Sequence, residues 1–185
     1  MESSGIKIGF TGSHGTGKTT ISIAVANELG VTLIEERARM FSELGFDLNK
    51  KASLETQLLM LVDQVAAESG PFHTWVADRI LIDYLAYIVC LDHTPSKQIQ
   101  TMLENNIAWM MRGVHFSGRY DHIFLVPTGK ITLLADILRP DDIYYQELID
   151  SNIRFYLDKF GIPFHEIQSV TLTDRVQEVL EVIYP

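Results

Sequence analysis

One stretch of the sequence decides the fold, Gly12-Ser13-His14-Gly15-Thr16-Gly17-Lys18-Thr19. It follows an apolar run at residues 6–11 that predicts a buried strand, and it leads into residues 18–29, whose apolar spacing predicts a helix. Glycines let the backbone curl until several N–H groups point at one anion, and the positive end of the following helix acts on the same spot. The stretch therefore predicts a phosphate-binding loop between a strand and a helix.

The end of this stretch adds the chemistry of a nucleotide site. Lys18 can reach β- and γ-phosphates, and Thr19 offers a hydroxyl to Mg²⁺. This is the P-loop pattern Gly-x-x-x-x-Gly-Lys-Thr, which a random chain of this length would contain roughly once in a hundred. For His14, a donor to the phosphates and a solvated loop position remain equal alternatives. We expect the loop to bind ATP with Mg²⁺ through Gly12, Ser13, His14, Gly15, Thr16, Gly17, Lys18, Thr19 and Thr20.

Strand and helix patterns alternate along the rest of the chain. Further strands are predicted at residues 31–34, 74–77, 121–126 and 164–167, and helices at residues 37–44, 54–69, 80–91, 96–111, 142–160 and 174–183. Such alternation indicates an α/β protein, with parallel strands and helices on both faces of the sheet. We expect a P-loop NTPase fold with five strands, in one domain over residues 1–185. Because ligands of such sheets bind beyond the carboxyl ends of the strands, the residues after each strand are the site candidates.

Composition and charge argue against several other classes of protein. The net charge of −9 and the pI near 5.0 make nucleic acid an unlikely partner, because a broad nucleic-acid footprint needs a basic face. The longest apolar run, residues 80–91, is too short to cross a membrane and contains Asp83. The six histidines form no His-x-x-x-His pair, so a zinc site is not indicated. The short polar start predicts no signal peptide, and we expect a cytoplasmic protein.

Charged residues follow the second predicted strand. Glu36 can accept a proton from an attacking hydroxyl or hold a metal-bound water. Arg37 and Arg39 can bind an anionic substrate, because a guanidinium matches phosphate or carboxylate with two hydrogen bonds. A charged, solvated helix start is the equal alternative for this segment.

An acid and an arginine follow the third predicted strand. Asp78 is well placed for Mg²⁺ beside a P-loop, and Arg79 can clamp an acceptor phosphate. The alternative is a helix N-terminus with Asp78 as its cap. Asp83, on the next helix, is interpreted as a structural polar partner.

Two further arginines are candidates later in the chain. Residues 127–142 are predicted to form a mobile lid, from which Arg139 could reach the transferring phosphoryl group, although Pro140 and its acids also suit a helix start. Arg175, after the last strand, could stack on the nucleotide base. A surface arginine on the last helix is the equal alternative for Arg175.

Together these residues resemble the nucleoside and nucleotide kinase branch of P-loop proteins, nearest to the kinase domain related to bacterial ribosylnicotinamide kinase. The resemblance implies a five-stranded parallel sheet, a lid with an arginine, and ATP with Mg²⁺ as phosphoryl donor. By position, Glu36 resembles the catalytic or magnesium-organising acid, and Arg139 resembles the lid arginine. Asp78 and Arg79 resemble the acid–arginine pair after the third strand. The resemblance rests on residues 11–20, Glu36-Arg37-Ala38-Arg39, Asp78-Arg79, residues 83–87, Leu138-Arg139-Pro140, residues 145–157 and Gly161-Ile162-Pro163.

We therefore expect a kinase that transfers the γ-phosphate of ATP to a nucleoside, a nucleotide or a related small metabolite. The acceptor should lie between residues 35–39 and Arg79. Two alternatives stay open: a regulatory NTPase module that signals to a partner protein, and a kinase acting on a hydroxyl of a modified base in DNA. We expect no membrane association, and a homodimer is compatible with these expectations. Residues after Val126 supply no second acid for a metal site, and no sequence feature identifies the acceptor.

Overall fold

The sheet at the centre of the molecule holds five parallel strands. The computed structural model describes residues 5–70, 73–113, 118–129 and 143–185. The strands lie in the order β2-β3-β1-β4-β5, so the chain moves from β1 to one side of the sheet and later returns to the other side. Strand order reverses at β1, which places a ligand crevice at its carboxyl end. The strands are β1 Lys7–Thr11, β2 Thr32–Ile34, β3 Trp75–Ala77, β4 His122–Leu125 and β5 His165–Glu166.

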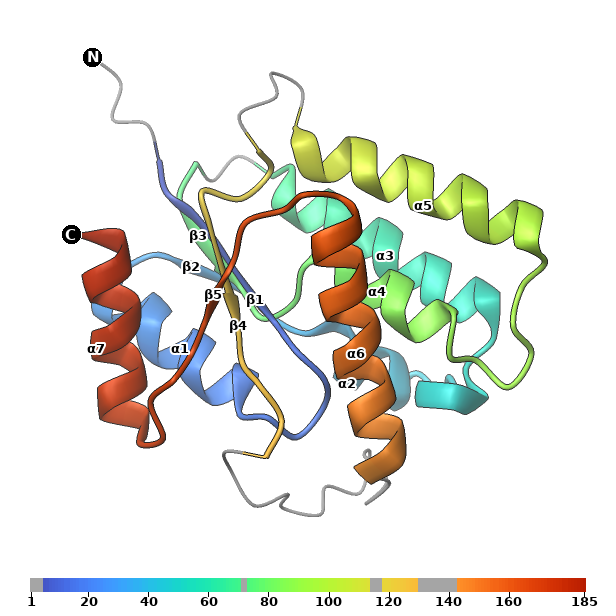
Figure 1. Ribbon diagram of the computed structural model, residues 1–185, viewed down its shortest axis with the longest axis horizontal. Coiled ribbons are helices and arrows are strands. Elements are labelled where there is room, and N and C mark those ends of the chain that lie inside the picture. Colours follow the sequence, from blue (N-terminus) through green and yellow to red (C-terminus); the bar gives the residue numbers. More distant parts are fainter. Residues whose placement is uncertain (1–4, 71–72, 114–117, 130–142) are drawn as a thin grey trace.

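Helices cover both faces of this sheet (Figure 1). On one face, α1 and α7 pack with the sheet around Ile8, Phe10 and Phe124. On the other face, α3, α4, α5 and α6 bury a larger apolar cluster against Ala77 and Leu125. Successive residues of β4 point to opposite clusters, as the period of two along a strand requires. The helices are α1 Lys18–Leu29, α2 Arg37–Glu43, α3 Leu54–Glu68, α4 Leu81–Ile88, α5 Lys97–Arg112, α6 Ile143–Lys159 and α7 Leu172–Ile183, and a short 3₁₀ helix spans Asn49–Lys51.

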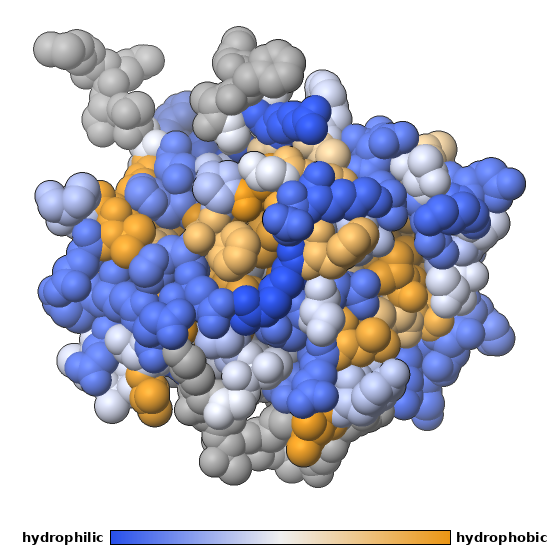
Figure 2. Space-filling view, in the orientation of Figure 1, coloured by the Kyte–Doolittle hydropathy of each residue, from blue (hydrophilic) through white to orange (hydrophobic). Residues whose placement is uncertain are grey.

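The surface of the molecule follows from its composition. Hydrophilic residues cover most of the face seen in Figure 2, and apolar side chains form separate groups between them. Within the residues that the structure describes, no helix is both long and apolar enough to cross a membrane. Cys90 is half-buried, and burial raises the pKa of its thiol to about 11.

The predicted fold class is confirmed, and all five strands and seven helices lie where the sequence patterns place them. Some boundaries differ from the prediction. The helix predicted for residues 80–91 ends at Ile88, and α7 begins at Leu172 because the Thr171 side chain accepts a hydrogen bond from the Asp174 N–H. The 3₁₀ helix at Asn49–Lys51 was not predicted. Most of the lid predicted at residues 127–142, including Arg139, lies outside the described residues.

Candidate active site

The glycines of the loop between β1 and α1 adopt backbone conformations that other residues rarely adopt. Gly12 has φ 139°, and a Cβ there would lie 2.4 Å from the carbonyl oxygen of Val126, the residue that follows the neighbouring strand β4. Gly15 and Gly17 also have positive φ, at 72° and 88°. Gly17 is the N-cap of α1, where it offers no side chain to the first N–H groups of the helix. The loop thus presents backbone donors and a helix N-terminus to an anion, as the sequence predicts.

Lys18 lies folded back onto this loop. Its Nζ donates a hydrogen bond to the carbonyl oxygen of Ser13 over 2.6 Å, and the Thr16 hydroxyl donates to the same oxygen over 3.1 Å. Burial, followed by repulsion from Arg79, lowers the pKa of Lys18 to about 8. An anionic phosphate in the loop would favour the charged ammonium that burial disfavours. Lys18 is therefore placed to exchange a carbonyl partner for a phosphate.

Arg175 supports the loop from α7. Its Nη1 donates to the carbonyl oxygen of Thr16 over 3.2 Å, and its Nε donates to the carbonyl oxygen of Ser169 over 3.0 Å. The residue is only 2% exposed, so the alternative of a surface arginine is wrong. Arg175 therefore links the phosphate loop to the residues that precede α7. Stacking of Arg175 on a nucleotide base remains a prediction.

Two other side chains form hydrogen bonds to the loop and to the residue before it. Asp83 of α4 accepts a hydrogen bond from the Thr11 hydroxyl over 2.6 Å, as its interpretation as a structural partner requires. Gln146 of α6 donates to the carbonyl oxygen of His14 over 2.8 Å. His14 is 1% exposed, so the solvated alternative for this residue is wrong.

Asp78 lies just beyond β3 with its carboxylate buried beside the loop. Neither of its oxygens has a hydrogen-bond partner among the described residues. The Thr19 side chain is close enough to lower the pKa of Asp78 but lacks hydrogen-bond geometry. Burial, and then the charge of Glu36, raise this pKa to about 6. Asp78 does not cap a helix, because α4 begins at Leu81 with Ile80 as its N-cap.

These oxygens fit a magnesium ion that is bound together with a nucleotide. Asp78, Thr19 and Glu36 line one cleft of about 1,090 Å³, counting the solvent at its mouth. Within the described part of the chain, no cluster of three or more His, Cys, Asp or Glu side chains could hold a metal ion. Mg²⁺ is commonly held by one or two carboxylates together with substrate phosphates and water. Asp78 and Thr19 would therefore hold the ion only in combination with bound phosphates.

Glu36 and Arg79 form a buried ion pair. Arg79 reaches Oε1 of Glu36 with Nε at 2.7 Å and Nη2 at 2.6 Å. Glu36 is the N-cap residue of α2, yet its side chain makes no capping hydrogen bond within the described chain. Nη1 of Arg79 has no hydrogen-bond partner among the described residues. A buried donor therefore remains for a ligand, although much of the Arg79 charge is neutralised by Glu36.

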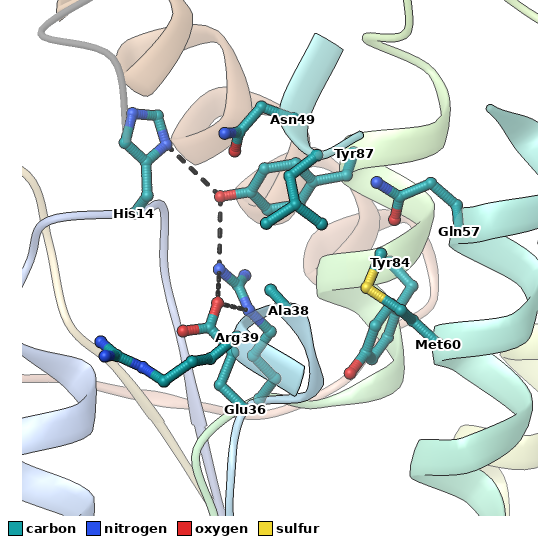
Figure 3. Close-up of a pocket in the computed structure, with 11 residues that line it drawn as sticks. His14, Glu36, Ala38, Arg39, Asn49, Gln57, Met60, Tyr84 and Tyr87 are labelled. Carbon is teal, nitrogen blue, oxygen red and sulfur yellow. Dashed lines mark hydrogen bonds and ion pairs between the residues drawn. The ribbon is translucent and has the colours of Figure 1, made fainter. Parts of the chain in front are cut away.

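This ion pair is linked to the phosphate loop through Tyr87. Nη2 of Arg79 donates to the Tyr87 hydroxyl over 3.4 Å, and that hydroxyl lies 3.4 Å from Nδ1 of His14. Dashed lines in Figure 3 mark this series of contacts. The loop and the segment after β3 therefore share one continuous polar wall.

These four residues, His14, Tyr87, Arg79 and Glu36, also line a pocket next to the phosphate loop. Its volume is about 580 Å³, counting the open space at its mouth. Glu36 and His14 lie on one side in Figure 3, and Gln57, Met60 and Tyr84 lie on the other. The lining residues are His14, Glu36, Ala38, Arg39, Leu48, Asn49, Gln57, Met60, Arg79, Tyr84 and Tyr87.

Gln57 is a pocket residue that the sequence analysis missed. It is 3% exposed and lines the pocket. A side-chain amide at such a position can offer a donor and an acceptor to a ligand. The signal was present in the sequence, because Gln57, Gln64 and Glu68 repeat at helical spacing on the buried face of α3.

The remaining predicted arginines occupy different positions. Nε of Arg37 lies 3.0 Å from Oδ2 of Asp63 on α3, so this guanidinium is directed to the neighbouring helix. Arg39 is exposed and lines both the pocket and the cleft. The structure therefore brings Lys18, Glu36, Asp78 and Arg79 together, with Arg39 at the edge. Arg37 also lines the cleft, but its guanidinium is paired with Asp63.

Comparison with known proteins agrees with this geometry. A family model described as an AAA domain matches residues 7–175. No curated protein matches the sequence significantly.

Solved structures share the fold at low sequence identity. Deoxyadenosine kinase from M. mycoides is 17% identical with a TM-score of 0.68, over 96% of this chain and 98% of that one. Thymidylate kinase from Ehrlichia chaffeensis is also 17% identical, with a TM-score of 0.64, over 98% and 100%. A NadR protein in complex with NR is 18% identical with a TM-score of 0.75, and this chain spans 51% of its length. The resemblance to the P-loop kinase branch is thereby confirmed as a likeness of fold.

Proposed function

This chain belongs to the AAA domain family, and on that premise we propose that it is a Mg²⁺- and ATP-dependent kinase acting on a nucleoside or a related small metabolite. One observation carries the proposal. The Glu36–Arg79 ion pair lies between the phosphate loop, beside which Asp78 is buried, and a pocket lined by aromatic, amide and charged side chains. The two substrates of a phosphoryl transfer would meet at that pair.

On the donor side, the loop supports binding of the triphosphate. The backbone donors and Lys18 would surround the β- and γ-phosphates, where negative charge shifts during transfer. Mg²⁺, when bound, would neutralise part of that charge, with Asp78 and Thr19 as its protein ligands. The lid role of Arg139 belongs to the same proposal and concerns residues outside those described.

On the acceptor side, Glu36 would act as the base. An acceptor hydroxyl oxygen forms a bond to the γ-phosphorus, the bond from that phosphorus to the bridging oxygen of ADP breaks, and the hydroxyl proton passes to the Glu36 carboxylate. The adjacent Arg79 guanidinium favours the ionised carboxylate that a base requires. Arg79 thus stabilises the base while its Nη1 remains available to the acceptor.

The charges around the pocket favour an uncharged acceptor over a phosphorylated one. Arg79 is the buried cation of the pocket and is paired with Glu36, and Arg37 is paired with Asp63 outside the pocket lining. Arg39 lies exposed at the edge of the pocket, where solvent weakens its attraction for an anion. A phosphate monoester would need cations that are not already neutralised. Sugar hydroxyls suit the Glu36–Arg79 pair, and the Gln57 amide suits a planar ring with its own donors and acceptors. Tyr84 and Tyr87 could contact such a ring.

A panel of acceptors with γ-labelled ATP and Mg²⁺ tests the proposal. The panel contains ribonucleosides, deoxynucleosides, nicotinamide riboside, nucleoside monophosphates, and DNA with hydroxylated bases. We expect label in at least one free nucleoside, and more label there than in its monophosphate. Label only in DNA would replace this function with a DNA kinase, and ATP turnover only with a partner protein would indicate a regulatory module.

A further inference from the structure

A buried polar chain lies behind the acceptor pocket, between α3 and α4. Gln64 of α3 is fully buried and does not line the pocket. Its Nε2 donates to the carbonyl oxygen of Arg79 over 3.0 Å, and its Oε1 accepts from the Tyr84 hydroxyl over 3.3 Å. One amide therefore connects two residues that form the pocket wall.

A buried carboxylate orients this amide. Nε2 of Gln64 also donates to Oε1 of Glu68 over 2.8 Å, so both of its hydrogens are used. The Glu68 side chain is 0% exposed, and it accepts from the Tyr120 hydroxyl over 2.7 Å and from Nε of Arg119. The Tyr120 hydroxyl accepts in turn from the N–H of Leu81, the first residue of α4. The chain thus contacts the segment after β3 at residues 79, 81 and 84.

Stability alone does not account for such a chain. Replacing a buried ion pair by apolar side chains of similar volume is often neutral or stabilising, because burial of the charges is costly. Directional hydrogen bonds provide what apolar packing does not, a fixed distance between the bonded groups. Here the bonded groups are the main chain of Arg79 and the side chain of Tyr84.

We propose that Gln64, oriented by Glu68, is a positioning residue that fixes the acceptor-binding wall formed by Arg79 and Tyr84. The proposal rests on the proposed function for its kinetic consequences. The side-chain hydrogen bonds of Gln64 do not reach the phosphate loop, and Gln64 does not line the cleft that contains Asp78. Its loss should therefore weaken acceptor binding and leave ATP binding unchanged.

Gln64→Met tests the proposal, because methionine keeps the shape of the side chain and removes its hydrogen bonds. We expect the KM for the acceptor to rise about tenfold, the equivalent of one or two net hydrogen bonds, with the KM for ATP within about twofold of wild type. Tyr120→Phe removes one hydroxyl further along the chain and should raise the acceptor KM by a smaller factor. It also serves if Gln64→Met does not fold.

The matched control lies between α5 and α6, where Glu104 accepts from the Tyr156 hydroxyl over 3.2 Å and from Nζ of Lys159 over 2.7 Å. This group joins a carboxylate, a tyrosine and a cation in the same way, but neither of its hydrogen bonds reaches a residue that lines the pocket. Glu104→Gln should leave both KM values unchanged.

A second readout needs no acceptor. Amide hydrogen exchange in residues 79–84 should accelerate in Gln64→Met, while exchange in residues 12–19 stays as in wild type. Unchanged exchange in residues 79–84, or equal increases of both KM values, would overturn the positioning role. Failure of wild type to label any acceptor would count against the proposed function alone, because the exchange measurement still tests Gln64.

Discussion

The phosphate loop and the acceptor pocket lie side by side, but they are built in different ways. The loop is eight consecutive residues whose backbone conformation is set by glycines and whose donors are mostly main-chain N–H groups. The pocket takes its lining from the loop, the segment after β2, the 3₁₀ helix, α3, the segment after β3 and α4. Its chemistry lies in side chains such as Gln57 and the Glu36–Arg79 pair.

This difference assigns phosphoryl transfer to the loop and the choice of acceptor to the pocket. A backbone site depends on a few positions that must be glycine or lysine, and it serves any triphosphate donor. A pocket of side chains can change its ligand by single substitutions without losing the fold. Substitutions in the loop should therefore abolish transfer, whereas substitutions in the pocket should alter which acceptor is used.

The largest effect is expected for Lys18→Ala, on the loop side of the comparison. Phosphoryl transfer should fall by about a thousandfold or more, because charge on the β- and γ-phosphates loses its cation. The protein should stay folded, because burial lowers the pKa of Lys18 to about 8, which means that burying the charged lysine costs free energy of folding. Transfer from labelled ATP and circular dichroism measure the two outcomes.

Lys159→Ala is the control, because Lys159 is paired with Glu104 away from the site. Near-normal transfer by a folded Lys18→Ala protein would show that the loop does not bind the reacting phosphates.

Glu36→Gln tests the role of Glu36 as the base, at the residue that lines both the pocket and the cleft beside the loop. The kcat should fall by about a hundredfold to a thousandfold, because the acceptor hydroxyl loses its base, and the KM for ATP should change little. Glu35→Gln is the matched control, since Glu35 is the adjacent carboxylate and is exposed. Steady-state kinetics decide, and an equal loss in both variants would remove Glu36 from the role of base.

Gln57→Leu tests the pocket alone. The KM for the acceptor should rise about tenfold to a hundredfold, while the KM for ATP stays unchanged, because a buried amide that pairs with a ligand is lost. Thermal stability should change little, since leucine places an apolar side chain at this buried position. Gln177→Leu, on the exposed side of α7, is the control. A fall in stability without a change in acceptor KM would assign Gln57 a structural role.

The smallest effect is expected on stability, at Glu178. This carboxylate binds the N–H of Ser169, whose carbonyl oxygen accepts from Arg175, and Arg175 contacts the phosphate loop. Partial burial raises the pKa of the Glu178 carboxyl. Hydrogen bonds from the Gln168 N–H, His165 and the Ser169 N–H outweigh burial and lower this pKa to about 2. Because the folded-state pKa is below the ordinary 4.5, this stabilisation is fully present above pH 4.5 and is lost as the pH falls towards 2.

Urea unfolding of wild type and Glu178→Gln at several pH values measures this contribution. The difference in free energy of unfolding should be constant above pH 5 and shrink below pH 4.5. A difference that is independent of pH would mean that the ionised carboxylate contributes nothing.

The sequence by itself determined the strands, the helices, the phosphate loop and the identity of the acids that follow β2 and β3. Each depends on interactions between residues close in the chain: apolar periodicity, helix caps, and glycines that permit positive φ. Parallel strands then place Glu36 and Asp78 at one edge whatever the details of packing. For that reason the location of the site could be predicted from the pattern alone.

Only the tertiary structure decided what each charged side chain meets. Glu36 and Arg79 are 43 residues apart and Arg175 and Thr16 are 159 apart, and no local pattern encodes such partners. From its position in the sequence, Arg37 was expected to bind the acceptor, but because α2 packs on α3 its guanidinium pairs with Asp63. Long side chains reach different partners according to the rotation of the helix that carries them, and that rotation is fixed when apolar faces pack into the core. The acceptor pocket, built from such side chains, was therefore decided by the tertiary fold.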